Sequence, residues 1–478
     1  MPKIDPRIFR AYDIRGRAGE QITEEAARLI GHAFGEEVKK RSGKKNPKLV
    51  VGRDARLSSP GLLDALKNGL QVAGCTVLDM GETPSPLNYF TICRLGLDGG
   101  AQITASHNPG HDNGIKLQMK DAEAFAGEDL QRLREGIEQR KNGKSQMANG
   151  KSQVESIDAI TPYLDHLKTM FGDIGKGMTV VVDGGNGVAG PVYVKALKNT
   201  GAKVIELFTE PDGNFPNHPA DPSKHSTLKD LQEMVRKEKA DLGFAFDGDG
   251  DRLGIVDENG VIRNADEILL LMAKDLLSRH PGSPVIFTVS NSSILETEIK
   301  KCGGKPVMCK VGHSFVEHAM RQHGAKLGGE QSGHFFCEED YYGFDDALVA
   351  ALRMLKIYSE FRTCPEPSRR VPNSELYFSS LFSTFPKVYQ APEWRPHCPD
   401  DRKGEVIAAI TAHFQKDYPV NTLDGARIDF GDGAWAGIRQ ANTSPCISVC
   451  MEARSPEKLR EVEEVVREHV RSYPEIGK

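Results

Sequence analysis

The residues best suited to chemistry lie in one short segment, residues 101–116, with the sequence AQITASHNPGHDNGIK. A β-favouring run leads into Ser106 and His107, and Pro109 ends the strand because it biases the preceding residue away from helix. We therefore expect Ser106 on a loop at a strand end, beside His107 and within reach of Lys116. This placement suits a serine that reacts, although a short run of this kind is equally compatible with a polar turn.

A second candidate site is the acidic run DGDGDR, residues 247–252, directly after the predicted strand DLGFAF. Asp247, Asp249 and Asp251 alternate with glycine, and alternate residues of an extended segment share one face. Three carboxylates on one face repel one another, and a divalent cation with oxygen ligands resolves that repulsion; a solvated acidic turn is the other interpretation. Arg252 beside them indicates an anionic ligand, most naturally a phosphoryl group.

Two further polar segments are suited to a sugar phosphate. GEQSGH places Glu330 two positions from Ser332, between glycines that allow close backbone approach, and this pattern suits vicinal sugar hydroxyls. Later in the chain Arg439 precedes Asn442 and Thr443, and these side chains could enclose a phosphate together with loop amides. Each segment is also compatible with a structural turn.

A competing function comes from GNGVAG, residues 185–190, which follows a predicted strand and opens a helix, with Glu206 at the end of the next strand. This spacing satisfies the dinucleotide-binding fingerprint and makes a nicotinamide-dependent oxidoreductase an alternative. A tight strand-to-helix turn requires the same glycines for geometry alone. The oxidoreductase hypothesis also leaves TASHNP, DGDGDR and GEQSGH without roles.

The elements that must position these segments recur three times. Each copy has a β-rich run, a small-residue or polar loop, a helix, a second strand and a third strand; the expected helices lie at residues 61–70, 193–197 and 294–301. Such alternation predicts parallel sheets with crossover helices. The third strands lead into TASHNP, DGDGDR and GEQSGH, and ligand sites in open α/β sheets lie beyond the carboxyl ends of strands. We therefore expect three faces of one cleft.

Other segments complete the organisation. A helix is expected from Thr23, its N-cap, to Val38, and residues 132–153 are expected to form a polar linker or exposed turn. After a proline-dense boundary near residue 363, a helix at 404–414, clustered strands and a last helix capped by Ser455 predict an α+β unit. The predicted fold class is α/β, with three similar mixed α/β domains plus a C-terminal α+β domain, at residues 1–153, 154–256, 257–367 and 368–478.

Composition limits the kind of partner. The chain has 478 residues, which is too long for one compact core. Its net charge of -5 gives no reason to expect nucleic acid or an anionic membrane as a partner. No apolar run approaches membrane-spanning length, and the N-terminal residues lack the apolar core of a signal peptide. Nine cysteines without C-x-x-C spacing predict reduced thiols in a cytoplasmic protein.

Six segments, FRAYDIRG, TASHNP, DGDGDR, GEQSGH, YYGFDDAL and RQANTSP, follow one another across nearly the entire chain. Together they resemble the α-D-phosphohexomutase superfamily, most closely its bacterial phosphomannomutase/phosphoglucomutase group. The resemblance implies four domains around a central cleft and interconversion of the 1- and 6-phosphates of mannose and/or glucose. It also implies a phosphoserine, Mg²⁺ and a hexose 1,6-bisphosphate that is both intermediate and activator.

The resemblance assigns roles to individual residues. Ser106 is implied to carry the transferable phosphate and to share Mg²⁺ with Asp247, Asp249 and Asp251. Implied positive groups around the transferring phosphoryl group are Arg15, Lys116 and Arg252, with His107 beside them, and His313 is a candidate for proton transfer or sugar contact. The implied substrate contacts are Tyr12, Glu330, Ser332, His334, Arg439, Asn442 and Thr443.

The chain departs from the family pattern at two positions. Ala441 stands where the distal phosphate loop commonly has serine, and a lysine found in some relatives is replaced near Ser290. A phosphoglucosamine mutase is the nearest alternative, and a sugar-phosphate-binding protein without turnover is a third hypothesis. The expected partners are small-molecule sugar phosphates, with the chain acting as a monomer or homodimer.

Overall fold

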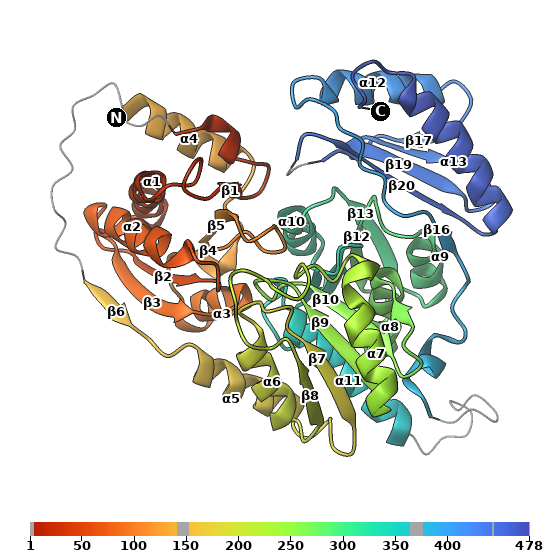
Figure 1. Cartoon of the computed structure of the whole chain (residues 1–478), viewed down its shortest axis with the longest axis horizontal. Helices are drawn as coiled ribbons and strands as arrows, with labels where there is room; N and C mark the ends of the chain where they lie inside the picture. The colour runs from red at the N-terminus through yellow and green to blue at the C-terminus, as the bar shows by residue number, and fades with distance from the viewer. Residues whose placement is uncertain (1–3, 141–152, 364–375, 442–443, 478) are drawn as a thin grey trace. The chain divides into compact units, whose positions relative to one another are not determined.

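The computed structural model describes residues 4–140, 153–363, 376–441 and 444–477 (Figure 1). They belong to two compact units. The first consists of Met1–Asp275 and Ser332–Ser383, and the second of Leu276–Gln331 and Thr384–Lys478.

The first unit begins with a six-stranded sheet in the order β1-β5-β4-β2-β3-β6. Its parallel strands are β4 (Gly99–Ile103), β2 (Lys48–Arg53), β3 (Thr76–Glu82) and β6 (Val154–Ser156). Strand β5 (Asp112–Met119) pairs antiparallel with both β4 and β1 (Ile14–Arg17). The antiparallel return of β5 brings Lys116 back beside Gln102, one residue before the end of β4.

Four helices accompany this sheet: α1 (Glu24–Ser42), α2 (Ser59–Val72), α3 (Ser85–Leu95) and α4 (Glu128–Arg140). The hydroxyl of Thr23 accepts a hydrogen bond from Ala26 N, which confirms the predicted N-cap of α1. Helices α1 and α2 approach closely because glycines face the contact. A Cβ at Gly69 would lie 2.1 Å from Arg28 O, and a Cβ at Gly31 would lie 2.4 Å from Leu66 O.

The predicted polar linker at residues 132–153 is wrong in its first part, because α4 runs to Arg140. Leu133 and Ile137 of α4 are buried in the core of the first sheet. Leu130 of the same helix is buried there too, and the other residues of α4 are so polar that these three apolar positions give only a weak sequence signal of a buried face. The rest of the predicted linker and the proline-dense stretch after Thr363 lie almost entirely outside the described residues.

The second sheet of the first unit has the order β11-β10-β9-β7-β8. Strands β8 (Lys203–Leu207), β7 (Thr179–Asp183) and β9 (Leu242–Phe246) are parallel, whereas β10 (Leu253–Asp257) and β11 (Ile262–Arg263) continue the sheet antiparallel. The accompanying helices are α5 (Ile160–Phe171), α6 (Gly190–Asn199) and α7 (Lys229–Glu238). Helix α8 (Ala265–Arg279) follows β11, begins in the first unit and ends in the second. The chain turns back from β9 to β10 through the predicted acidic run, residues 247–252.

A later segment of the chain also belongs to the first unit. It contains β15 (Phe335–Cys337) and α11 (Ala347–Thr363), and Leu253 N of β10 donates to Gly333 O at 3.0 Å. Asp346 caps α11 by accepting from the backbone N–H groups of Leu348 and Val349. The phenols of Tyr163 and Tyr341 also donate to Asp346, so the start of α11 is tied to α5.

The second unit contains the parallel strands β13 (Lys305–Cys309), β12 (Pro284–Thr288) and β14 (Leu327–Gly329), with α9 (Ser293–Lys301) and α10 (His313–His323). It also contains an antiparallel sheet in the order β16-β20-β19-β18-β17. These strands are β16 (Tyr389–Gln390), β20 (Ile447–Ala453), β19 (Trp435–Gln440), β18 (Ala426–Asp429) and β17 (Val420–Asn421). Helices α12 (Lys403–Phe414) and α13 (Pro456–Arg471) accompany the sheet, and Ser455 caps α13 as predicted.

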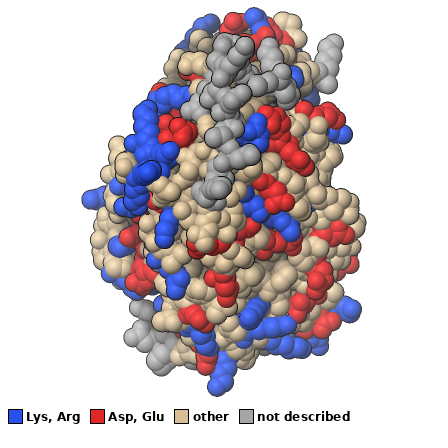
Figure 2. Space-filling view, turned by 90° about the vertical axis from the view of Figure 1, so that its left-hand side faces the viewer, with Lys and Arg blue, Asp and Glu red and all other residues tan. Residues whose placement is uncertain are grey.

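These elements confirm the predicted fold class of three similar mixed α/β domains and a C-terminal α+β domain. On the face shown in Figure 2, positive and negative side chains are interspersed. Within the described residues, no helix combines the length and the apolar character needed to cross a membrane.

Candidate active site

The loop after β4 holds Ser106 in an unusual backbone conformation. Ser106 has a φ of 51° and is 1% exposed, and its N–H donates to the hydroxyl of Thr104 at 2.8 Å. The loop also closes on itself, because Asn108 N donates to Ala105 O at 3.0 Å. A left-handed φ is uncommon for residues other than glycine and indicates backbone strain that the surroundings must sustain.

The loop after β9 is built around its first carboxylate. Asp247 Oδ1 accepts from the backbone N–H groups of Gly250, Asp251 and Arg252 at 3.0, 3.0 and 3.2 Å. The side chains of Asp247, Asp249 and Asp251 are all fully buried. The strand-following acidic run therefore forms a compact turn, with its carboxylates kept inside.

These two loops meet in the first unit. The hydroxyl of Ser106 donates to Asp247 Oδ2 at 2.5 Å, and a Cβ at Gly248 would lie only 2.5 Å from Ser106 O. Lys116 from β5 donates to Asp249 Oδ2 at 2.7 Å and to Asp251. The structure thus brings together the predicted reactive serine, the predicted lysine and all three predicted metal-ligating carboxylates.

The charges and donor atoms of this cluster fit a divalent cation. One carboxylate oxygen from each of Asp247, Asp249 and Asp251 lies within 4.8 Å of the others. Within the described part of the chain, Asp249 Oδ1 and Asp251 Oδ1 are buried without a hydrogen-bond partner. Burial, with the neighbouring charges of Asp251 and Asp249, raises the pKa of Asp247 well above its ordinary value. Buried oxygen donors with no other partner are what a hard cation requires.

The site also holds two arginines. Arg15 is buried, and its guanidinium donates to Asp13 at 2.6 Å, to Ala105 O at 3.1 Å and to the side-chain oxygen of Asn108 at 3.2 Å. Arg252 Nε lies 4.0 Å from Asp247 Oδ2. Both guanidinium groups are therefore beside the serine and aspartate loops, as expected for groups that neutralise an anion.

The two predicted histidines of this unit have different surroundings. His334 Nε2 accepts from Arg252 Nε at 2.9 Å, so its proton resides on Nδ1, which faces Asp345 at 2.9 Å. His107 Nδ1 lies 3.3 Å from the hydroxyl of Ser106. Burial, followed by the charges of Arg252 and Arg15, holds the pKa of His107 well below its ordinary value, so its imidazole is neutral.

Other predicted contacts lie in the second unit. Glu330 is buried and accepts from Gly312 N at 2.7 Å, and His313 begins α10 directly after that glycine. Arg439 lies in β19 and donates to Gln440 O at 3.1 Å. Asn442 and Thr443 lie outside the described residues. The predicted sugar-binding segment is divided, because Glu330 belongs to the second unit and Ser332 to the first.

Tyr12 is half-buried just before β1, in the first unit.

Several site-supporting residues were not identified from the sequence. Ser85 donates to Asp249 Oδ2 at 2.6 Å, and Lys403 Nζ donates to Ala441 O at 2.8 Å beside the predicted phosphate loop. Asp345 stands in YYGFDDAL after β15, and Arg56 in the GRDAR run that begins at the end of β2. For these two residues, a position on a loop that follows a strand was the available signal, whereas Ser85 and Lys403 begin helices α3 and α12.

The glycine-rich segment after β7 supports the aspartate loop. A Cβ at Gly187 would lie 2.9 Å from the backbone of Gly248, and Val188 N donates to Gly248 O at 3.1 Å. Gly190 opens α6, and a Cβ there would lie 2.0 Å from Thr209 O. Packing alone therefore accounts for these glycines, and the dinucleotide-binding hypothesis has no further observation in its favour.

The chain matches the four sequence profiles of one family along most of its length. They are described as "Phosphoglucomutase/phosphomannomutase, alpha/beta/alpha domain I", domain II and domain III over residues 6–144, 161–260 and 264–373, and the C-terminal domain over residues 395–469.

Relatives of known name agree. A phosphomannomutase/phosphoglucomutase of Pseudomonas aeruginosa is 40% identical over 472 residues, covering 98% of this chain and 97% of the relative. A phosphoglucomutase of Neisseria gonorrhoeae is 36% identical over 479 residues, covering 100% of this chain and 99% of the relative. The crystal structure of a phosphoglucomutase/phosphomannomutase family protein from Burkholderia thailandensis, 36% identical, covers 98% of each chain with a TM-score of 0.86.

Fold, matched profiles and relatives together define the class: a hexose phosphate mutase, which is an intramolecular phosphotransferase of the isomerase class. The chain belongs to the phosphoglucomutase/phosphomannomutase family.

Proposed function

We propose that Ser106 carries the phosphoryl group that this mutase transfers. The observation that carries the proposal is the 2.5 Å contact between the Ser106 hydroxyl and Asp247, in a buried cluster that includes Lys116. Asp247, Asp249 and Asp251 would hold Mg²⁺ together with that phosphate. The cation would supply charge neutralisation for the equatorial oxygens of the transferring group.

The chemistry is two phosphoryl transfers in opposite directions. In the first, the bond between phosphorus and Ser106 Oγ breaks while a bond forms to the free hydroxyl of a hexose 1- or 6-phosphate, and that hydroxyl gives its proton to a base, for which His107 and His313 are the proposed groups. The resulting hexose 1,6-bisphosphate turns around. In the second transfer the bond between its other phosphorus and the sugar oxygen breaks, a bond forms to Ser106 Oγ, and the sugar oxygen takes the proton back as the isomeric hexose phosphate leaves. Arg15, Lys116 and Arg252 would neutralise the charge that spreads over the transferring group.

The residues outside the serine and aspartate loops would grip the substrate in both orientations. We propose that Glu330 and Ser332 bind sugar hydroxyls, with Tyr12 and His334 as further substrate contacts. Arg439, Asn442 and Thr443 would bind the phosphate that does not react, and Lys403 supports this by holding the carbonyls of Ala441 and Ser444. His107 and His313 are the proposed groups for proton transfer or substrate contact.

We further propose that the four predicted domains divide as the sequence indicates and that the chain acts in the cytoplasm. The eight described cysteines are free thiols, which supports a reducing compartment. A monomer or homodimer is expected, and light scattering of the purified protein measures this.

The test is an assay of glucose, mannose and glucosamine 1-phosphates with Mg²⁺ and a trace of the matching 1,6-bisphosphate, combined with peptide mapping for phosphate on Ser106. Turnover of glucose or mannose phosphate with phosphate on Ser106 supports the proposal. Turnover of glucosamine phosphate alone would assign the related amino-sugar reaction. Turnover with phosphate on another residue would contradict the role of Ser106.

A further inference from the structure

Arg56 is a fully buried arginine at the carboxyl end of β2 that the proposed chemistry does not use. It is 0% exposed, and its Nε donates to Asp54 Oδ2 at 2.9 Å. Its other four N–H groups would be costly to bury without acceptors. They are directed to the backbone of the loop that carries Ser106.

The guanidinium donates to four carbonyl oxygens of that loop. Nη2 donates to the carbonyls of Ser106 and Asn108 at 2.7 and 2.6 Å. Nη1 donates to the carbonyls of Pro109 and Asp112 at 2.5 and 2.9 Å. All five N–H groups of the guanidinium thus have acceptors, and one planar group spans the loop from its serine to the start of β5.

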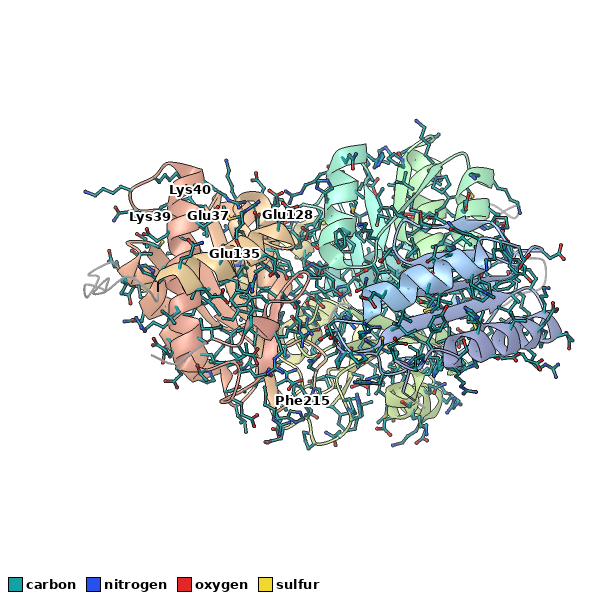
Figure 3. All side chains as sticks on the ribbon, turned by 90° about the horizontal axis from the view of Figure 1, so that it is seen from above. Glu37, Lys39, Lys40, Glu128, Glu135 and Phe215 are labelled. Carbon is teal, nitrogen blue, oxygen red and sulfur yellow. The ribbon has the colours of Figure 1, made fainter. Side chains whose placement is uncertain are left out.

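Arg56 is itself held from several sides. Asp54 Oδ1 accepts from Arg56 N at 3.0 Å and from Ser59 Oγ at 2.6 Å, and Asn113 donates to that same hydroxyl at 3.0 Å. The ring of Phe215, labelled in Figure 3, lies 5.2 Å from the guanidinium carbon. The guanidinium is therefore fixed before it contacts the loop, as positioning of a reacting group requires.

We propose that Arg56 is the positioning residue of the phosphoryl carrier. By fixing the carbonyls on both sides of His107, it sustains the left-handed backbone of Ser106 and aims the hydroxyl at Asp247. This inference rests on the proposed function, because it assigns Arg56 to the orientation of Ser106. Arg56 touches no reacting atom, so its effect falls on the transfer step and leaves substrate binding intact.

Lysine is the informative replacement, because Arg56→Lys keeps the charge but has three donors on one nitrogen and cannot span four carbonyls. A reacting atom misplaced by about 1 Å loses roughly 100-fold in rate. We expect kcat of Arg56→Lys to fall by about that factor, with KM for the sugar phosphate unchanged. Hydrogen exchange of the loop peptide should become faster, at the amides of Ser106, Asn108 and Asp112, which are hydrogen-bonded in the wild type.

The matched control is Leu66→Ala, which removes a fully buried side chain of the same domain where α2 packs on α1. It should lower the melting temperature but keep kcat and the exchange rate of the loop peptide. A wild-type kcat in Arg56→Lys overturns the proposal, and so does an equal loss of kcat and equal loop exchange in Leu66→Ala.

A second variant decides the question if Arg56→Lys does not fold. Asp54→Asn keeps one acceptor for Arg56 N but removes the countercharge at Nε, so we expect a loss of about 10-fold in kcat and faster loop exchange. A wild-type kcat and wild-type loop exchange in Asp54→Asn overturn the proposal. Hydrogen exchange needs no activity, so a wild-type protein inactive on every sugar phosphate would refute the proposed function and leave the loop measurement valid.

Discussion

The serine loop, residues 105–112, and the aspartate loop, residues 247–252, are stabilised by opposite chemistry. In the serine loop, backbone carbonyls accept from a guanidinium that lies outside the loop. In the aspartate loop, backbone N–H groups donate to a carboxylate that belongs to the loop itself. Both solutions supply hydrogen-bond partners to backbone groups of a tight turn that follows a strand.

The difference determines which functions can be separated by mutation. Arg56 supports the serine loop without touching the reacting atoms, so the shape of that loop can be changed while Ser106 remains. Asp247 closes the aspartate loop with one oxygen and faces Ser106 with the other. Structure and chemistry therefore depend on one carboxylate in the aspartate loop but on two residues in the serine loop.

The largest expected effect is on Ser106 itself. Ser106→Ala removes the phosphate carrier, so mutase activity should fall by about 10,000-fold or more. The protein should stay folded, because the lost hydroxyl contacts only the side chains of Asp247 and His107 among the described residues. The measurement is turnover with bisphosphate present, alongside a thermal melt. Ser156→Ala, at an exposed position of β6, is the control and should be fully active. Near-normal activity in Ser106→Ala would refute the role of the serine.

Two replacements of Asp247 should separate its role in the stability of the loop from its role in activity. Asp247→Ala deprives three buried N–H groups of their acceptor, so the free energy of unfolding should fall by about 3 kcal/mol or more. Asp247→Asn retains an acceptor oxygen and should fold, yet lose about 1,000-fold in activity because a proposed Mg²⁺ ligand is gone. Urea denaturation measures the stability of each variant, and kcat measures its activity. Equal stability of both variants would contradict the role of Asp247 Oδ1 as the acceptor that stabilises the loop.

Lys116 connects the serine side of the site to the aspartate loop. Lys116→Met removes the ammonium group that pairs with the buried carboxylates of Asp249 and Asp251. The free energy of unfolding should fall by about 3–5 kcal/mol. Added Mg²⁺ should restore part of the loss, measured by urea denaturation with and without the ion. Lys67 also bridges two aspartates, but its side chain is 17% exposed, so Lys67→Met should cost about 1 kcal/mol or less. Equal losses in both variants would contradict this account.

The smallest expected effect concerns the pH dependence of the serine loop. The folded-state pKa of His107 lies below the value of 6.5 for an unperturbed histidine, so as pH falls below that value the unfolded chain binds a proton that the folded chain does not. The titration of His107 therefore lowers the free energy of unfolding as pH falls below 6.5 and leaves it unchanged above that pH. Wild type should therefore lose stability relative to His107→Gln between pH 7.5 and 5, measured by urea denaturation of unphosphorylated protein. Parallel profiles would refute this.

Much of the fold was predictable because its signals are local. The alternation of strands and helices, the Thr23 and Ser455 caps and the strand-following polar segments can each be recognised within a few residues. The first part of the predicted linker was wrong, because Leu133 and Ile137 become a core face only when α4 packs beside α1. The antiparallel pairing of β5 with β1, by contrast, joins strands that lie far apart along the chain.

The types and spacing of the residues specify the chemical groups of the site: a serine and three alternating carboxylates on loops that end strands, together with a lysine and arginines. The partners of these groups follow from the way distant segments pack. Ser106 and Asp247 are 141 residues apart along the chain, and no local pattern states that their loops meet. Arg56 is the clearest case, because GRDAR resembles an ordinary charged turn, and its four carbonyl acceptors exist only after β2, β4 and β5 have paired.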